Sequence, residues 1–187
     1  MGHPRGFTLI EAMVTVAIIT IMGGLTMWQI NRQLPRYRTT NAAGKFVLDV
    51  RKASSIAIRT NRPITLTVNP DGCTPGYTLT QGDVHYERTC FGDEYRGVAY
   101  KPAGGTISCA SETAAGFAPL PSCSLCSGTR TIDFLPTGEV ITASGTDESL
   151  IIGPVDDAPG FDRAVGIRNV TGKARAYVRV GSGWDCP

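Results

Sequence analysis

An acidic residue, Glu11, stands alone in an apolar segment that is otherwise uncharged. The segment runs for 24 residues from Phe7 to Ile30, which is long enough for a helix to span a bilayer. A carboxylate within a membrane span costs about 2.5–3.5 kcal/mol, so Glu11 needs a cationic partner. If the chain is cut between Gly6 and Phe7, the new amino group lies four residues before Glu11, on the same helical face. The spacing therefore predicts an ion pair, either within one subunit or between neighbouring helices.

Three other interpretations explain this segment less well. A secretory signal peptide would end in a small-residue cleavage site after its apolar core, whereas this segment continues into a basic stretch. A buried helix of a soluble protein is seldom apolar on every face for so long. An ordinary signal anchor has the right length but gives no reason for Glu11. Arg5 precedes the segment, and Trp28 lies where an interfacial aromatic residue would anchor its far end.

The residues GFTLIEAMVTVAII resemble the prepilin cleavage and methylation motif of type IV pilin-like proteins. That resemblance implies a leader, residues 1–6, which prepilin peptidase removes by cutting between Gly6 and Phe7. It also implies that Phe7 is methylated and that Glu11 acts in filament assembly. The expected partners are the peptidase, other major and minor pilins or pseudopilins, and the inner membrane. Before assembly the chain would be held in that membrane with a periplasmic domain; afterwards it would lie in a periplasmic or cell-surface filament, at its tip.

The predicted membrane-spanning half of the helix covers residues 7–30, and an amphipathic half follows at residues 31–62. Apolar side chains recur in the second half at three- and four-residue spacings; they are Phe46, Val47, Val50, Ala53, Ala57 and Ile58. One helix from about Thr8 to Arg59 is therefore expected, with its second half lying against an apolar surface. Pro35 is expected to kink or interrupt this helix.

Beyond Arg62 the apolar residues follow the two-residue period of strands. Strands are expected at ITLTV, YTLTQ, VHYERTC, TIDFL, EVITA, SLIIG, AVGIRNV and KARAYVRV. Residues 91–97 and 102–128 are rich in Gly, Pro, Ser and Cys, and are expected to be loops held by disulfides. The predicted fold class is α+β, with a long transmembrane and amphipathic α-helix packed on a C-terminal antiparallel β-sheet domain, residues 63–187, in a pilin-like arrangement.

The six cysteines predict disulfides formed in an oxidising compartment. They are Cys73, Cys90, Cys109, Cys123, Cys126 and Cys186. The sequence does not choose among the possible pairings. Cys123 and Cys126 have the CxxC spacing of redox and zinc sites, but no second such pair completes a zinc ribbon and no βαβ pattern surrounds them. Structural disulfides are therefore expected, with no metal and no cofactor, and Cys186 is expected to tie down the C-terminal tail.

No residue pattern in the chain indicates catalysis. His3 lies in the leader, so His85 is the only histidine of the mature chain, and no nucleophile-elbow motif is present. His85 is expected on a strand, facing solvent or a cross-strand neighbour. We therefore assign no catalytic residues and do not expect an enzyme.

Three segments of the second half resemble the GspH/FimT (FimU) group of minor pilins and pseudopilins. They are RKASSIAIRTNRPITLTV, TIDFLPTGEV and GKARAYVRVGSGWDCP, which resemble that group's helix-to-strand segment, hairpin and terminal strand. The resemblance implies a subunit that takes part in the assembly or the tip of a type IV pilus-like filament. Two alternatives stay open. One is a FimT-like DNA-binding minor pilin for DNA uptake in natural transformation, and the other is an H-type pseudopilin of a type II secretion system.

Basic residues alternate along the last predicted strand, so they share one of its faces. The residues of this basic face are Lys173, Arg175, Tyr177 and Arg179, and Arg168 is expected to extend it. Several cations at this spacing could contact a phosphate backbone together, and Tyr177 could support a base or sugar. This arrangement makes DNA a possible partner.

A second interpretation of the basic face rests on the distribution of charge. Residues 163–187 carry five basic residues and one acid, whereas residues 101–162 carry two basic residues and eight acids. A basic strand face is ordinarily solvated or paired with an acidic surface of the same or a neighbouring subunit. The segment GKAR at 172–175 nevertheless resembles the Gly-Arg-x-Arg motif through which some FimT-type pilins capture DNA. Lys173 replaces the first arginine of that motif, which keeps the charge but loses the guanidinium fork.

Overall fold

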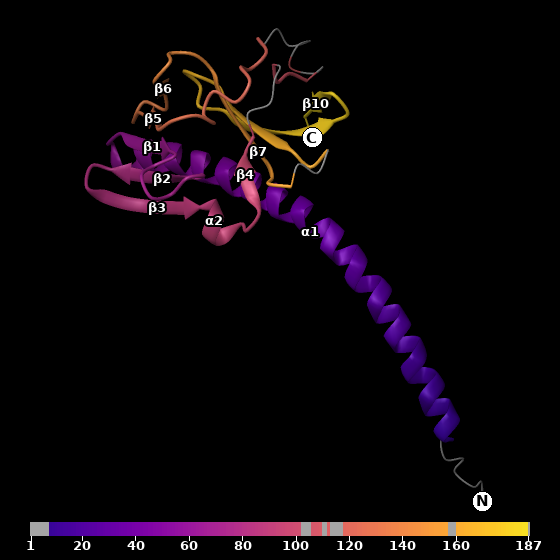
Figure 1. Ribbon diagram of the computed structural model, residues 1–187. Helices are drawn as coiled ribbons and strands as arrows, with labels where there is room; N and C mark the ends of the chain where they lie inside the picture. Colours follow the sequence, from indigo (N-terminus) through magenta and orange to yellow (C-terminus); the bar gives the residue numbers. More distant parts are fainter. Residues whose placement is uncertain (1–7, 102–105, 110–111, 113–117, 157–159, 187) are drawn as a thin grey trace, which may run out of the picture. The chain divides into compact units, whose positions relative to one another are not determined.

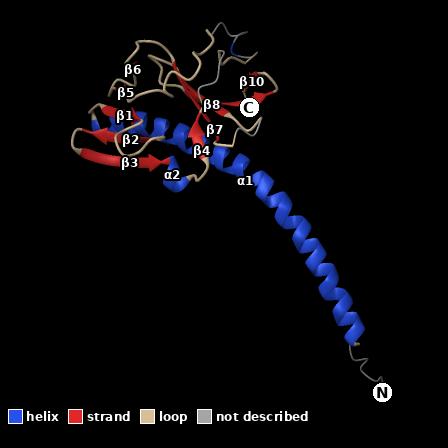
Figure 2. Cartoon of the chain, in the orientation of Figure 1, coloured by secondary structure: helices blue, strands red, loops and turns tan. Residues whose placement is uncertain are grey.

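The computed structural model describes residues 8–101, 106–109, 112, 118–156 and 160–186. The chain divides into two compact units, residues 1–34 and 35–187, and each is described by itself. The first unit contains the beginning of helix α1 (Leu9–Thr60). The second contains the rest of α1, a short helix and the β-strands (Figures 1 and 2).

In the first unit, α1 presents its apolar side chains outward. The large hydrophobic side chains described between Leu9 and Ile30 are 50–79% exposed. The helix is long and apolar enough to cross a membrane, judged by length and composition. Its bounds agree closely with the predicted helix, because the run from Leu9 contains no residue that forbids a helix until Pro35.

Pro35 was expected to kink or interrupt the helix; it lies inside α1, so an interruption at this residue is wrong. Proline lacks the N–H that would bond the carbonyl four residues earlier, which costs about 3 kcal/mol in a helix interior. The helix continues because the turns on either side keep their own bonds. The Thr39 hydroxyl also donates to the Pro35 carbonyl at 2.9 Å. Pro35 is the first residue of the second compact unit.

In the second unit, α1 buries one stripe of small and apolar side chains. Phe46, Val50, Ala53 and Ala57 are fully buried, as their spacing predicts. Ile58 is the exception, because its side chain is 54% exposed and the neighbouring Ile56 is buried in its place. The buried stripe joins the two sheets in one hydrophobic core.

The first sheet has the strand order β3-β2-β1-β5-β6, and all neighbouring strands are antiparallel. Its strands are β1 (Ile64–Val68), β2 (Gly76–Gln81), β3 (Val84–Cys90), β5 (Arg130–Phe134) and β6 (Val140–Thr142). Ile64, Leu66 and Val68 of the central strand are fully buried, and the threonines between them are partly exposed. The alternation therefore turns one face of the sheet toward the core.

The second sheet has the strand order β10-β9-β8-β7-β4, again antiparallel throughout. Its strands are β4 (Val98–Tyr100), β7 (Glu148–Pro154), β8 (Arg163–Ile167), β9 (Ala174–Val180) and β10 (Gly183–Asp185). Every residue of β7 and β8 is buried, so both faces of the sheet centre are covered. The observed architecture confirms the predicted α+β fold of a long helix packed on antiparallel sheets.

Three short elements were not expected. Helix α2 (Phe91–Glu94) lies in a region predicted to be a loop, and β4 and β10 are strands of three residues. Such elements are too short to show a period in the sequence. The loop predicted at 102–128 is only partly described. Within it Ile107 and Leu120 form an isolated antiparallel bridge, and residues 102–105, 110–111 and 113–117 lie outside the described residues.

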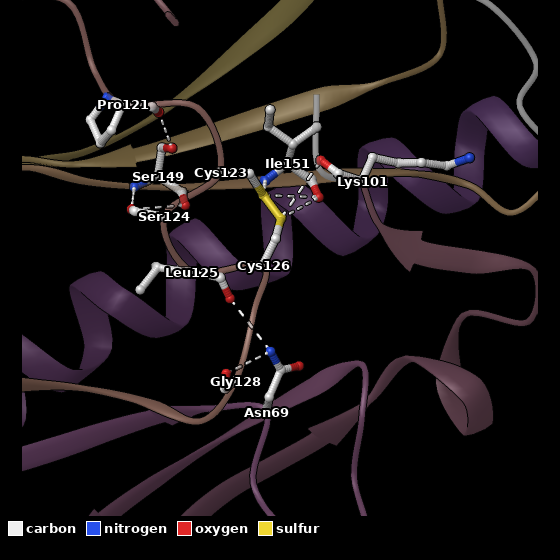
Figure 3. Close-up of a disulfide and its surroundings, with 10 residues drawn as sticks. All are labelled: Asn69, Lys101, Pro121, Cys123, Ser124, Leu125, Cys126, Gly128, Ser149 and Ile151. Carbon is white, nitrogen blue, oxygen red and sulfur yellow. Dashed lines mark hydrogen bonds between the residues drawn. A yellow bond between two sulfur atoms is a disulfide. The ribbon is translucent and has the colours of Figure 1, made fainter. Parts of the chain in front are cut away.

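All six cysteines are paired, as Cys73–Cys90, Cys109–Cys186 and Cys123–Cys126. Cys186 follows β10, so its bond fastens the end of the chain to the segment of Cys109. The CxxC pair closes a short loop beside β7. Figure 3 shows the Ile151 N–H directed at the Cys123 sulfur, 3.0 Å away. The CxxC segment therefore forms a disulfide that is hydrogen-bonded to the second sheet.

An ionic cluster links α1 to β3. The amino groups of Lys45 and Lys52 each lie 3.0 Å from a carboxylate oxygen of Glu87, and Lys45 lies equally close to Asp49. The buried Asp49 also accepts a hydrogen bond from the Tyr77 hydroxyl at 2.7 Å. Hydrogen bonds from Lys52 and Lys45 lower the pKa of Glu87. The cluster holds an outer strand of the first sheet to the helix.

Candidate functional site

Glu11 lies in the first turn of α1, and its side chain is exposed. Its backbone N–H faces the Thr8 hydroxyl at 3.4 Å. Gly6 and Phe7 lie outside the described residues, so the ion pair between Glu11 and the amino group of Phe7 stays a prediction. The carboxylate projects from an apolar helix surface that lipid or neighbouring helices would have to cover.

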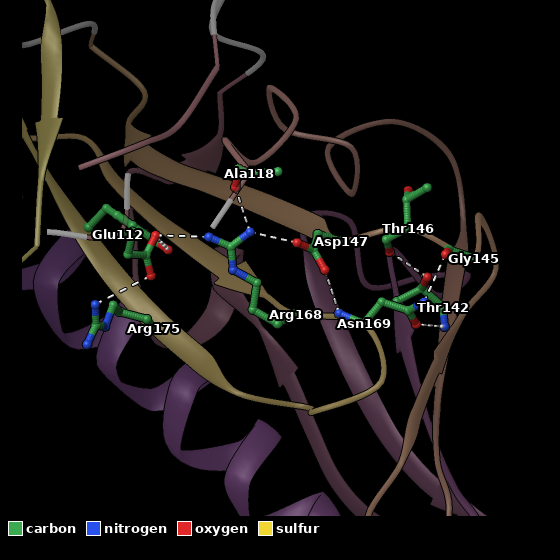
Figure 4. Close-up of polar contacts among 10 residues, drawn as sticks. Glu112, Ala118, Thr142, Gly145, Thr146, Asp147, Arg168, Asn169 and Arg175 are labelled. Atoms are coloured by element: carbon green, nitrogen blue, oxygen red, sulfur yellow. Dashed lines mark hydrogen bonds and ion pairs between the residues drawn. The ribbon is translucent and has the colours of Figure 1, made fainter. Parts of the chain in front are cut away.

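Arg168, expected to extend the basic face, is instead held among acidic and carbonyl groups (Figure 4). Its guanidinium lies 2.6 Å from the Asp147 carboxylate and 3.0 Å from that of Glu112, and donates to the Ala118 carbonyl at 2.7 Å. Only 12% of the Arg168 side chain is exposed. The hydrogen bond to Asp147 and the nearby carboxylates outweigh desolvation and raise the pKa of Arg168. Arg168 therefore joins β8 to two distant segments of its own chain.

Two arginines of β9 also have acidic partners. Arg175 lies 3.4 Å from Glu112, with 52% of its side chain exposed. Arg179 lies 2.8 Å from Asp162, and its guanidinium stands 5.9 Å from the centre of the Trp184 ring. These acids come from the acidic region 101–162, so the second interpretation of the basic face holds for both arginines. Lys173 precedes β9 and is exposed.

Tyr177 is buried, which corrects its expected place on an open strand face. Only 1% of the residue is exposed, and its hydroxyl donates to Glu112 at 2.8 Å. Burial, reinforced by this hydrogen bond, raises the pKa of Tyr177. The ring and Leu120 occupy the space beside Gly166, where an added Cβ would lie 3.1 Å from the ring. The segment of Leu120 covers this face, so the ring offers no open surface to a base.

A pocket of about 690 Å³ opens between α1 and the turn from β8 to β9. Arg51 and Ser54 line it from the helix, and residues 171–175 line it from the turn. Glu112, Arg168 and Tyr177 complete the lining. The structure thus brings four of the five predicted basic-face residues to one concave site and leaves Arg179 outside it.

The sulfurs of Cys109 and Cys186 and a carboxylate oxygen of Glu112 lie within 4.8 Å of one another, which is close enough for three metal ligands. Both sulfurs are shared in one disulfide, so neither is a thiolate ligand. The disulfide instead places Glu112, three residues after Cys109, beside the pocket.

His85 lies on β3 with its side chain exposed, the position expected for a strand histidine facing solvent. Its cross-strand neighbour is Thr80 of β2.

Residues 1–27 match the family model described as the prokaryotic N-terminal methylation motif. The chain has a type IV pilin-like N-terminus. This motif implies processing by prepilin peptidase and assembly with other pilins, and the apolar part of α1 fits membrane anchoring. Type IV pilin-like proteins are structural subunits rather than enzymes. No curated protein and no solved structure matches the chain.

Sequence reasoning missed Arg51, Ser54 and Glu112 as parts of the candidate site. Arg51 and Ser54 lie on the predicted amphipathic helix, but nothing in their spacing shows which strand turn they approach. The excess of acids in 101–162 indicated that partners for the basic strand lie there, without singling out Glu112. The disulfide that brings Glu112 to the site could not be chosen from the sequence.

Proposed function

We propose that this type IV pilin-like chain is a minor pilin or pseudopilin, which prepilin peptidase cuts before the chain joins a type IV pilus-like filament. One observation carries the proposal. The methylation motif runs into α1, and the large apolar side chains that the structure describes between Leu9 and Ile30 are half or more exposed. Fully covering one such side chain gains about 1.5–3 kcal/mol, so this surface favours lipid before assembly and neighbouring helices afterwards.

The acid of the span supports the same role. Within a bundle of such helices, Glu11 can pair with the amino group that cleavage creates on Phe7, in its own or an adjacent subunit. Pairing between subunits fixes how far one helix slides along the next. The GspH/FimT-like segments favour a minor subunit, near the filament tip, over the major one.

The first test is the site of cleavage and its consequence for assembly. The full-length chain, expressed beside its prepilin peptidase, should yield a mature protein whose sequence begins at Phe7, as measured by intact mass and N-terminal sequencing. Gly6→Leu should abolish the cut, whereas His3→Ala, also in the leader, should leave it unchanged. Glu11→Gln should be cut normally but be depleted in sheared filaments. Recovery of chains that still begin at Met1, or of Glu11→Gln in filaments at the normal level, would contradict the proposal.

The H-type pseudopilin of a type II secretion system is an alternative within the same proposal, because both assemblies use this N-terminal processing. Deleting the gene distinguishes them. Loss of pili with normal protein secretion supports the pilus, and loss of secretion with normal pili supports the secretion system. A deletion that changes neither pili, secretion nor transformation contradicts both.

The contacts of the basic face favour the structural role over the DNA-binding alternative. Arg168, Arg175 and Arg179 each lie within 3.4 Å of a carboxylate of their own chain. A DNA phosphate would have to displace that carboxylate at each arginine. Tyr177, which was to support a base, is buried.

A further inference from the structure

The pocket between α1 and the β8–β9 turn carries an excess of positive charge. Its lining contains Arg51, Arg168, Lys173 and Arg175 against one acid, Glu112. Within the described residues, Arg51 and Lys173 are exposed and have no acidic partner. They come from separate elements, the helix and the turn, and face the same space. A second anionic group would therefore find two cations that the fold itself does not neutralise.

Glu112 shows which anion the pocket accommodates. One of its carboxylate oxygens lies 3.0 Å from Arg168 and accepts the Tyr177 hydroxyl at 2.8 Å. The other lies 3.4 Å from one guanidinium nitrogen of Arg175, whose side chain is half exposed. A carboxylate matches the planar fork of a guanidinium. Ser54 and Thr171 also line the pocket, and their hydroxyls can bond peptide groups.

The shape of the site favours a peptide over a nucleic acid. A volume of about 690 Å³ is that of a pocket for a small ligand or a few side chains. A nucleic acid backbone needs a continuous row of accessible cations, and the basic residues of β9 and the β8–β9 turn do not form one. Arg179 lies outside the pocket beside Asp162, and Arg168 is 12% exposed. The aromatic ring that stacking would require is buried.

We infer that this pocket binds an acidic peptide segment, through its Asp or Glu side chains, and that a neighbouring filament subunit supplies it. The inference rests on the proposed function for the source of the segment. Arg51 and Lys173 hold the incoming carboxylates, Arg175 shares its guanidinium between them and Glu112, and Arg168 with Tyr177 keeps Glu112 in place. Filament subunits meet through unlike faces, so a basic pocket on one subunit receives an acidic loop of the next.

Binding is tested with the full-length chain in detergent and a fluorescein-labelled hexaglutamate peptide, followed by fluorescence anisotropy. Arg51→Gln with Lys173→Gln should weaken binding by at least about tenfold, because two charged contacts are lost. Arg59→Gln is the matched control: it removes an exposed arginine of the same helix outside the pocket, and should change affinity by less than about twofold. Unchanged thermal unfolding of all variants shows that they fold.

A chemical measurement locates the partner in assembled filaments. A carbodiimide joins an amine to a carboxylate in contact with it, as an amide. Cross-linked filaments should therefore yield, by mass spectrometry, a peptide that links Lys173 to an Asp or Glu of another subunit. Lys173→Arg keeps the charge but has no amine to couple, so it should lose this link and retain hexaglutamate binding.

Absence of hexaglutamate binding, or equal weakening by Arg59→Gln, would overturn the inference. So would a single-stranded oligonucleotide that displaces hexaglutamate, binds more tightly than hexaglutamate does, and is itself bound more weakly by the double variant. These outcomes leave cleavage at Phe7 and recovery in filaments untouched, so they are distinguishable from failure of the proposed function. Conversely, an uncut chain that still binds hexaglutamate through Arg51 and Lys173 would contradict only the filament role.

Discussion

At the scale of single residues, the centre of the site is the carboxylate of Glu112. It contacts Arg168, Arg175 and Tyr177, although only 12% of its side chain is exposed. Removing one member of a largely buried ionic group leaves the others without partners, which is more costly than the pair itself is favourable. Glu112 therefore both stabilises this end of the second sheet and competes with an incoming acidic ligand.

Glu112→Gln should separate these two effects, because the amide keeps the shape and loses the charge. We expect the free energy of unfolding in urea to fall by about 1–3 kcal/mol. We also expect hexaglutamate to bind several-fold more tightly, since Arg175 is then released from its internal partner. Glu139→Gln, an exposed glutamate outside the pocket, should change neither quantity. Weaker peptide binding by Glu112→Gln would show that no competition exists.

At the scale of elements, the attachment of β3 to α1 depends on charge. The pKa of Glu87 is lowered by its bonds from Lys52 and Lys45. The folded state therefore binds the proton of this carboxyl more weakly than the unfolded chain does. The resulting stability is present at pH values above the unfolded pKa and is lost as pH falls through the lower folded pKa.

Glu87→Gln should accordingly lower the free energy of unfolding at neutral pH by about 0.5–1 kcal/mol. The difference between the variant and the original chain should shrink toward zero at an acid pH below the lowered folded pKa of Glu87, where both side chains are uncharged. Urea titrations of both proteins at neutral pH and at the acid pH measure this difference in the free energy of unfolding. Glu94→Gln, an exposed glutamate of α2, provides the comparison and should show no such dependence. A difference that is equally large in acid would mean that the ion pairs are not its cause.

The strands show how far sequence patterns predict such elements. The alternation of Ile64, Leu66 and Val68 with threonines predicts both ends of β1 correctly. It does so because successive residues of a strand point to opposite faces, so an alternating sequence identifies the buried face and the exposed one. The helical period located α1 but mistook Ile58 for a buried side chain, because the last turns expose residues that the period alone would bury. Tyr177 was misplaced for a similar reason: alternation assigns a side chain to a face, and what covers that face comes from the segment of Leu120, far away in the chain.

At the scale of the whole molecule, the Cys109–Cys186 disulfide closes the longest disulfide-bonded loop in the chain, with a sequence separation of 77. It links the acidic segment of Glu112 to the strand pair β9–β10. Closing a loop of this length destabilises the unfolded chain entropically by about 4.5 kcal/mol, compared with about 1–2 kcal/mol for the separation of 3 between Cys123 and Cys126.

Replacing Cys109 and Cys186 by serine should therefore lower the thermal midpoint more than the matched replacement of Cys123 and Cys126. It should also speed amide hydrogen exchange in β10, whose pairing with β9 covers only three residues. Mass spectrometry after brief deuterium labelling measures this at residues 183–185. Equal destabilisation by both double substitutions would contradict the loop-length argument.

The edges of the two sheets matter for the proposed storage of subunits in the membrane before a filament is assembled. β4, β6 and β10 are outer strands of three residues, too short to template another chain. The seven-residue outer strand β3 carries Glu87 and Arg88, and Glu87 is already engaged by two lysines of the helix. The outer strands, whose backbone donors and acceptors are unpaired on one side, are therefore either short or carry charged side chains. Such edges disfavour strand pairing between stored subunits. The subunits would then associate through their helices, as the proposed filament requires.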